Sequence, residues 1–149
     1  MQKNNQRLEH NQLPRARLLT VVWGEDYIKI FLKRCLLSLL ADNNLPSFVK
    51  QVETEIVILT TSDSKEIFHK NRDFQALEKL CRVKFIDIDD LICPMYGFVL
   101  TLAYGRGVID TGDKQVDTYF VFLNSDFILA NGSLDTLAKL ILSGETVVL

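Results

Sequence analysis

The chain has 149 residues, the usual size of one domain, and can bury a core without disulfides or bound metal. Apolar residues make up 48% of it and charged residues 24%, which excludes an intrinsically disordered protein. The formal net charge is −2, and the sequence has no block of basic residues that could bind along a phosphate backbone. We therefore expect no nucleic-acid partner.

The cysteines and the apolar runs bear on location. Cys35 and Cys81 fall on apolar faces of predicted helices, where a free thiol behaves as a small hydrophobic group. Buried free thiols favour a reducing compartment. The first seventeen residues lack the apolar centre of a signal peptide, and no apolar run reaches the roughly 18 residues of a membrane helix. We therefore expect a cytoplasmic protein with no membrane span.

The amino-terminal part predicts a leader, a strand and a helix. Residues 1–16 are polar and rich in Asn and Gln, which favours a flexible leader. The run 17–24 (RLLTVVWG) is apolar and rich in β-branched residues, which is typical of a strand buried on both faces. A helix follows, ended by 42–44 and Pro46, because apolar residues recur at three- and four-residue steps. These residues are Ile28, Phe31, Leu32, Cys35, Leu36, Leu39 and Leu40.

A second strand is predicted at 55–61 (EIVILTT) and a third at 82–88 (RVKFIDI). Thr61, Ser62 and Asp63 are possible caps of the helix between them, because their side-chain oxygens can accept hydrogen bonds from the amides of a first turn. That helix carries its apolar side chains at Phe74, Leu77, Leu80 and Cys81.

The next predicted helix follows Pro94, and we expect Gly105 and Gly107 to weaken its end. Its apolar side carries Tyr96, Val99, Leu100 and Ala103. A fourth strand is predicted at 118–123 (TYFVFL).

The carboxyl-terminal part predicts an amphipathic helix over 133–143 and the start of a fifth strand at 146–149. Gly144 stands where the helix needs a carboxyl-terminal cap. The inward residues of the helix are Leu134, Leu137, Ala138, Ile141 and Leu142.

Repeated alternation of strands and helices predicts an α/β fold with three layers, α/β/α, around a mainly parallel central sheet joined by right-handed crossovers. In such a sheet, ligands bind beyond the carboxyl ends of the strands. The residues at that edge are therefore candidates for a site: Trp23 to Tyr27, Thr60 to Asp63, Asp87 to Asp90, and Asn124 to Asp126.

The apolar run 146–149 has no polar ending, which favours a fragment of a longer protein over a strand that closes the sheet at its edge. A fragment of that kind would expose apolar surface, so self-association is expected.

The fourth strand delivers Asn124, Ser125 and Asp126 to the carboxyl edge. Carboxylate oxygens are the hard ligands that Mg²⁺ or Mn²⁺ prefers, and the cation would neutralise charge on a diphosphate. The alternative is that Asp126 only caps a turn.

This stretch resembles the DxD region of GT-A glycosyltransferases, and the chain is similar to the amino-terminal, donor-binding half of family 2 of these nucleotide-sugar-dependent enzymes. The likeness rests on the strand ending in Trp23-Gly24, the helix through Leu39-Leu40, Thr60-Thr61, Tyr96, and the helix after Asn131-Gly132-Ser133. The resemblance implies a Rossmann-like sheet that binds a nucleoside-diphosphate sugar with Mn²⁺ or Mg²⁺.

The resemblance also implies roles for single residues. Asp126 would contact the metal. Asn124 replaces the first acid of the motif and would contact the ribose, and this replacement removes one negative charge from the motif. Trp23 would border or stack on the base. The remaining implied contacts to the nucleotide sugar are Gly24, Thr60, Thr61, Asp63 and Tyr96. The alternative is that Trp23 belongs to the core and that the Thr-Ser-Asp run only caps a helix.

The function that follows is transfer of a sugar from a nucleoside-diphosphate donor to an unknown acceptor. The acceptor-binding half, the catalytic base and a later metal ligand of this fold normally lie beyond the acidic motif, and few residues follow Asp126 here, so the chain alone is expected to be inactive. The alternative function is a non-catalytic Rossmann-like module that binds a nucleotide or a protein.

A second acidic cluster, Asp87, Asp89 and Asp90, is similar to the D-x-D motif of haloacid dehalogenase-type phosphotransferases. That motif lies on a first strand and is followed by small residues, whereas Leu91 and Ile92 follow here. A solvated turn is the preferred interpretation.

Overall fold

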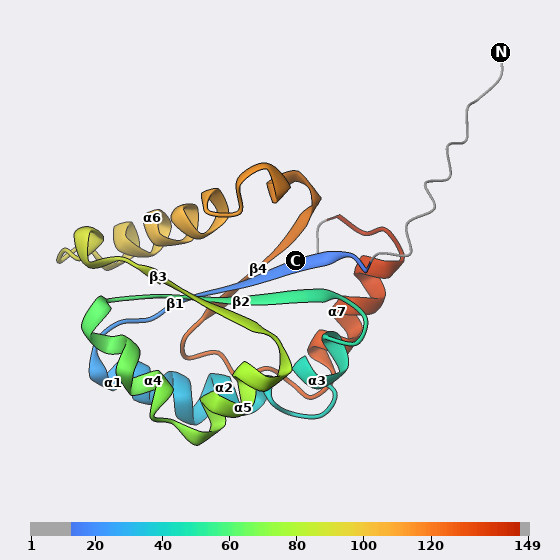
Figure 1. Cartoon of the computed structure of the whole chain (residues 1–149), viewed down its shortest axis with the longest axis horizontal. Coiled ribbons are helices and arrows are strands. Elements are labelled where there is room, and N and C mark those ends of the chain that lie inside the picture. The colour runs from blue at the N-terminus through green and yellow to red at the C-terminus, as the bar shows by residue number, and fades with distance from the viewer. Residues whose placement is uncertain (1–12, 147–149) are drawn as a thin grey trace, which may run out of the picture.

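Four parallel strands form one central sheet in the computed structural model, which describes residues 13–146. They are β1 (Arg15–Val21), β2 (Glu53–Thr60), β3 (Arg82–Asp87) and β4 (Thr118–Asn124), in the spatial order β3-β2-β1-β4 (Figure 1). The carboxyl ends of all four strands lie at a common edge, so the predicted parallel α/β sheet is confirmed.

The sheet explains why the strand sequences are continuous apolar runs. Strands β1 and β2 occupy the two central positions and are buried on both faces over most of their length. Strand β1 begins earlier than expected, because Ala16 is fully buried between β2 and β4; Arg15 and Ala16 therefore belong to the sheet and not to the leader. Residues 1–12 lie outside the described part of the chain.

One face of the sheet is covered by a thick layer of helices (Figure 1). The layer contains α1 (Glu25–Ile30), a π-helical turn (Phe31–Cys35), α2 (Leu36–Leu39), α3 (Leu45–Phe48), α4 (Lys65–His69), α5 (Arg72–Leu80) and α7 (Ser133–Leu142). Phenylalanines at 31, 48, 68 and 74 are fully buried in the core beneath it.

The segment after β2 differs from the expected single helix. It divides into α4 and α5, and Asn71 caps α5 by accepting a hydrogen bond from the Phe74 amide at 2.9 Å. The expected helix stop at Asn44 is a buried junction, since its side-chain amide donates to the carbonyls of Ser38 and Ala130 at 2.8 and 3.1 Å.

Helix α6 (Tyr96–Ile109) lies on the other face of the sheet, flanked by two short 3-10 helices, Asp89–Leu91 and Gly112–Asp117 (Figure 1). It runs through Gly105 and Gly107 to Ile109, so these glycines do not end the helix. Packing gives the reason at one of these glycines: a Cβ added to Gly107 would come within 3.1 Å of the Leu19 side chain. The close approach of α6 to the sheet therefore requires glycine at that position.

Helix α7 ends as predicted at Gly144, which adopts φ +89° and donates its amide to the Ile141 carbonyl at 3.0 Å. The prediction that Leu142 points inward is wrong, because 55% of it is exposed. The predicted fifth strand at 146–149 falls almost entirely outside the described residues.

Candidate functional site

The switch point of the sheet lies between β1 and β4. From β1 the chain builds outward to β2 and β3, then returns to pair β4 with the other side of β1. The loops that follow β1 and β4 therefore start side by side where the strand order reverses, and such switch points are where open α/β sheets bind ligands. Trp23 and Gly24 follow β1, and Asn124 ends β4.

Three aromatic side chains meet at this point and form an aromatic cluster, Trp23, Tyr27 and Tyr96. The Trp23 and Tyr96 rings stack with centroids 5.1 Å apart and planes inclined by 28°, and the Tyr27 ring lies 6.4 Å from Tyr96. They come from the end of β1, from α1 and from the start of α6. About half of Tyr27 and Tyr96 is exposed, so the cluster presents open aromatic surface at the ligand-binding edge.

Gly24 turns the chain from β1 into α1. Its φ of +79° lies in the left-handed region that favours glycine, and its carbonyl accepts the Ile28 amide at 3.0 Å. A Cβ at this position would have room, since its nearest neighbour, Tyr27, would be 3.9 Å away. Backbone conformation therefore accounts for this glycine, and the turn brings Tyr27 round to Tyr96.

Asn124 is held at the edge by Tyr104 of α6. The Tyr104 hydroxyl lies 2.9 Å from the Leu123 carbonyl and 3.3 Å from Asn124 Oδ1. Burial raises the pKa of Tyr104 to about 12, so the hydroxyl keeps its proton. The strand alternation places Asn124 on the α6 side of the sheet, as it does Trp23.

Asp126 projects from the turn that follows β4. The turn is closed by the Phe127 amide, which donates to the Asn124 carbonyl at 3.1 Å, and not by the Asp126 side chain. The Asp126 carboxylate is exposed and makes no ion pair among residues 13–146. Burial, the Tyr27 hydroxyl and this carboxylate together raise the pKa of Tyr96. Asp126 therefore acts electrostatically on the aromatic cluster.

The side chains after β2 bond to one another. The Thr61 hydroxyl donates to Asp63 at 2.6 Å and lies 2.7 Å from the Ser64 hydroxyl, and this hydrogen bond from Thr61 lowers the pKa of Asp63. Thr60 alternates with Ile56 and Ile58, so it faces the thick helical layer, on the side of the sheet opposite Trp23.

The second acidic cluster is a turn whose carboxylates have local partners. Asp89 accepts from the Ser62 hydroxyl, and Asp90 accepts two hydrogen bonds from Arg106 at 2.7 and 2.6 Å. This arrangement agrees with the expected turn.

The carboxyl edge offers a cation one exposed carboxylate, that of Asp126. Among residues 13–146, no group of three or more His, Cys, Asp or Glu side chains converges on one point. Mg²⁺ is often bound through one or two carboxylates together with phosphates and water. Asp126 supplies one carboxylate at this edge.

Comparison of the chain with protein-family models, with curated proteins and with solved structures found no match.

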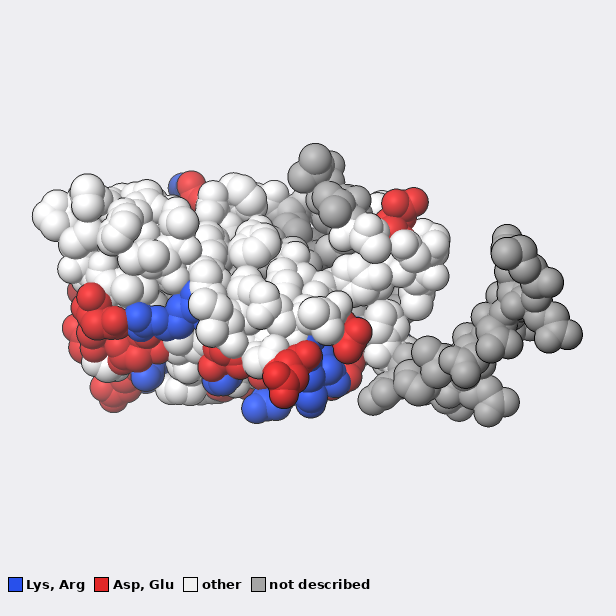
Figure 2. Space-filling view, turned by 90° about the horizontal axis from the view of Figure 1, so that it is seen from above, with Lys and Arg blue, Asp and Glu red and all other residues white. Residues whose placement is uncertain are grey.

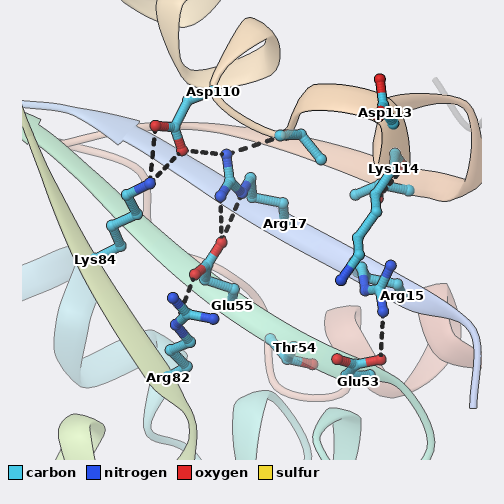
Figure 3. A pocket seen from close by; sticks show the side chains of 13 residues that line it. Arg15, Arg17, Glu53, Thr54, Glu55, Arg82, Lys84, Asp110, Asp113 and Lys114 are labelled. Carbon is cyan, nitrogen blue, oxygen red and sulfur yellow. Dashed lines mark hydrogen bonds and ion pairs between the residues drawn. The ribbon is translucent and has the colours of Figure 1, made fainter.

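A charged hollow of about 510 Å³ lies at the opposite, amino-terminal edge of the sheet (Figure 3). At its centre the nearly buried Arg17 pairs with Glu55 and Asp110, while Arg82 also binds Glu55 and Lys84 binds Asp110. These cations already have carboxylate partners, so they are less available to an anionic ligand. In the sequence, this hollow could have been found from the charged residues that occupy alternate positions in the first half of three strands.

The sequence placed Tyr27 at the carboxyl edge, and the turn at Gly24 brings it to Tyr96. Tyr104 was missed in the sequence. Tyr104 lies two turns after Tyr96 on the same helix, a spacing that would have placed both on one side.

The free thiols are buried or partly buried. Burial, reinforced by the Asp126 charge, raises the pKa of the Cys35 thiol to about 12, and burial together with Glu55 raises that of Cys81 to about 11. The expected buried thiol is confirmed for Cys35. No helix within residues 13–146 has the length and apolar character needed to cross a bilayer.

Proposed function

We propose that this chain binds a nucleoside-diphosphate sugar at the carboxyl edge of its sheet, as the donor-binding half of a GT-A-like glycosyltransferase. The observation that carries the proposal is the aromatic cluster at the switch point between β1 and β4, with the unpaired Asp126 carboxylate beside it. A nucleobase stacked on an exposed aromatic ring contributes about 1–3 kcal/mol to binding. The aromatic cluster offers such a ring.

The polar residues of the same edge would hold the rest of the donor. Asp126 would supply one oxygen ligand to Mn²⁺ or Mg²⁺, which neutralises charge on the diphosphate when bound. The Asn124 side-chain oxygen already accepts a hydrogen bond from the Tyr104 hydroxyl. The side-chain nitrogen of Asn124 is available to donate to a ribose hydroxyl. The bound sugar would then be transferred to an acceptor. We also propose a cytoplasmic location, because free thiols favour a reducing compartment.

Intrinsic fluorescence provides a direct test. Trp23 is the only tryptophan of the chain, so its emission reports on the aromatic cluster alone. UDP-, GDP-, ADP- and CDP-sugars should be titrated with and without Mn²⁺, with thermal unfolding followed in parallel. We expect one donor class to quench Trp23 and to stabilise the fold by about 2.7 kcal/mol at a hundredfold excess over its Kd. Absence of both effects for every donor would contradict the proposal.

A matched pair of variants locates the metal-dependent part of binding. Asp126→Asn should abolish the difference between titrations with and without Mn²⁺ and leave the Tm of the free protein nearly unchanged, because the carboxylate is exposed. Asp113→Asn removes an exposed acid at the opposite edge and should change neither quantity. Loss of Mn²⁺ dependence in both variants would exclude a specific role for Asp126.

Asn124 favours a second candidate, a non-catalytic module that binds a nucleotide without metal. An amide at this position removes one negative charge from the edge, and its oxygen already has a partner in Tyr104. For such a module, quenching of Trp23 would be equally strong in EDTA and in Mn²⁺ and would persist in Asp126→Asn.

A further inference from the structure

The outer face of α6 is uncovered. Arg106 is the only charged side chain in the 14 residues of this helix, and it turns down to Asp90 and to the Asp87 carbonyl. A helix that is apolar on all sides is normally buried on all sides. The inner side of α6 packs on the sheet, but nothing among residues 13–146 covers its outer side. Figure 2 shows this face as a broad, largely uncharged surface, with most of its charged residues gathered along one margin.

The exposed face has the relief of a helix-packing surface. Phe98, Leu102 and Ile109 are 52, 39 and 73% exposed, and their spacing of four and seven residues places them in one ridge. Gly97 and Gly105 lie beside the ridge, and a Cβ added to either would meet no atom within 4 Å. The backbone of α6 is thus open to close approach between these glycines.

Phe122 of β4 extends the apolar surface on the far side of the glycines. Its ring packs edge-to-face against Tyr104 at a centroid distance of 5.2 Å, and 51% of the residue is exposed. Met95, which precedes α6, is 62% exposed. We name Met95, Phe98, Leu102, Ile109 and Phe122 the α6 face.

We propose that the α6 face binds the same face of a second copy of the chain, with the two α6 helices crossing near their glycines. The area supports this occupant. Five side chains of this size, each about half exposed, present about 500 Å² of apolar surface. A stable interface buries about 800 Å² on each partner, about 60% of it apolar, which is also about 500 Å².

The charge of the face favours a second copy as well. The face itself carries no charge, so a two-fold arrangement brings no like charges together.

Sedimentation equilibrium over about 1 to 200 µM protein tests the proposal, a range suited to a Kd in the micromolar region. We expect a monomer–dimer equilibrium in the unmodified chain. Leu102→Glu places two carboxylates in the apolar interface and should weaken dimerisation at least about tenfold, as should Ile109→Glu. The matched control is Leu37→Glu, a leucine 49% exposed in the opposite helical layer, which should leave dimerisation unchanged.

Circular dichroism and a cooperative melt establish that each variant is folded, and the two α6 substitutions provide independent tests if one of them misfolds. A monomer throughout the concentration series would overturn the proposal. So would a dimer that both α6 variants leave intact, or one that Leu37→Glu dissociates as strongly as they do.

Discussion

Thr60 is the one buried side chain of the described residues whose polar atom has no hydrogen-bond partner. Its hydroxyl is enclosed at the carboxyl end of β2, on the side of the sheet that faces the thick helical layer. A buried hydroxyl without a partner loses its bonds to water on folding and is therefore destabilising. Valine has nearly the same shape and lacks that hydroxyl.

We therefore expect Thr60→Val to raise the free energy of unfolding by about 1 kcal/mol, measured by urea denaturation. The control is Thr54→Val in the same strand, which removes a hydrogen bond of 2.8 Å to the Val52 carbonyl and should lower stability. A loss of stability in Thr60→Val as large as that in Thr54→Val would show that the Thr60 hydroxyl has a partner in solution.

At the scale of elements, α6 is fixed to the sheet in two different ways. From Leu100 to Val108 it packs on apolar residues of the sheet. Its end is also held by Arg17, which donates to the Gly107 carbonyl, Asp110 and Thr111 at 2.9–3.0 Å. Lys84 of β3 also binds Asp110. The Asp110 carboxylate thus ties the last turn of the helix to two strands (Figure 3).

This attachment should weaken in acid. Burial acts to raise the pKa of Asp110, but hydrogen bonds from Lys84 and Arg17 outweigh it and hold that pKa below its ordinary value of 3.8. The ionised carboxylate therefore stabilises the fold above the ordinary pKa, and this contribution is lost as the pH falls through the lowered one. Asp110→Asn should cost about 1 kcal/mol at pH 7 after allowance for solvent screening, and progressively less below about pH 4.

Urea denaturation at a series of pH values would measure the effect, with Asp113→Asn as a variant of a neighbouring exposed acid. The stability difference between Asp110→Asn and the unmodified chain should shrink on acidification, and that of Asp113→Asn should stay near zero. A difference for Asp110→Asn that is constant from pH 7 to pH 3 would remove the carboxylate from the attachment of α6.

The sequence allowed the elements to be predicted better than their contacts. The apolar runs of β1 and β2 and the cap at Gly144 depend on local composition, and all three are present. The continuation of α6 through Gly107 depends on the distance between that helix and Leu19, which periodicity does not encode. The split between α4 and α5 depends on the cap at Asn71. This cap was not predicted, because the Thr-Ser-Asp run already offered three possible caps for a single helix.

The candidate site divides in the same way. Trp23, Asn124 and Asp126 could be placed at one edge, because parallel strands align their carboxyl ends. The burial of Thr60 on the opposite side depends on side-chain directions that are settled only when the sheet is assembled, whereas the hydrogen bond from Thr61 to Asp63 is local to the turn.

At the scale of the molecule, the two layers around the sheet are unequal. Among the described residues, the core beneath the thick helical layer contains 21 buried apolar residues and the core beneath α6 contains six. The free energy of opening a segment follows the apolar surface that it buries. Helix α6 should therefore detach from the sheet before the rest of the fold opens.

Native-state hydrogen exchange in low urea tests this expectation. In dilute, monomeric protein, amides of 96–109 should exchange by a partial opening whose free energy is below that of β2 amides, which require global unfolding. At higher protein concentration, α6 should gain protection if its outer face pairs with a second copy, and Leu102→Glu should remove that gain. If α6 and β2 open with the same free energy in the monomer, the molecule unfolds as one unit. In that case the small core and the Arg17 contacts together hold α6 as firmly as the larger core holds the other helices.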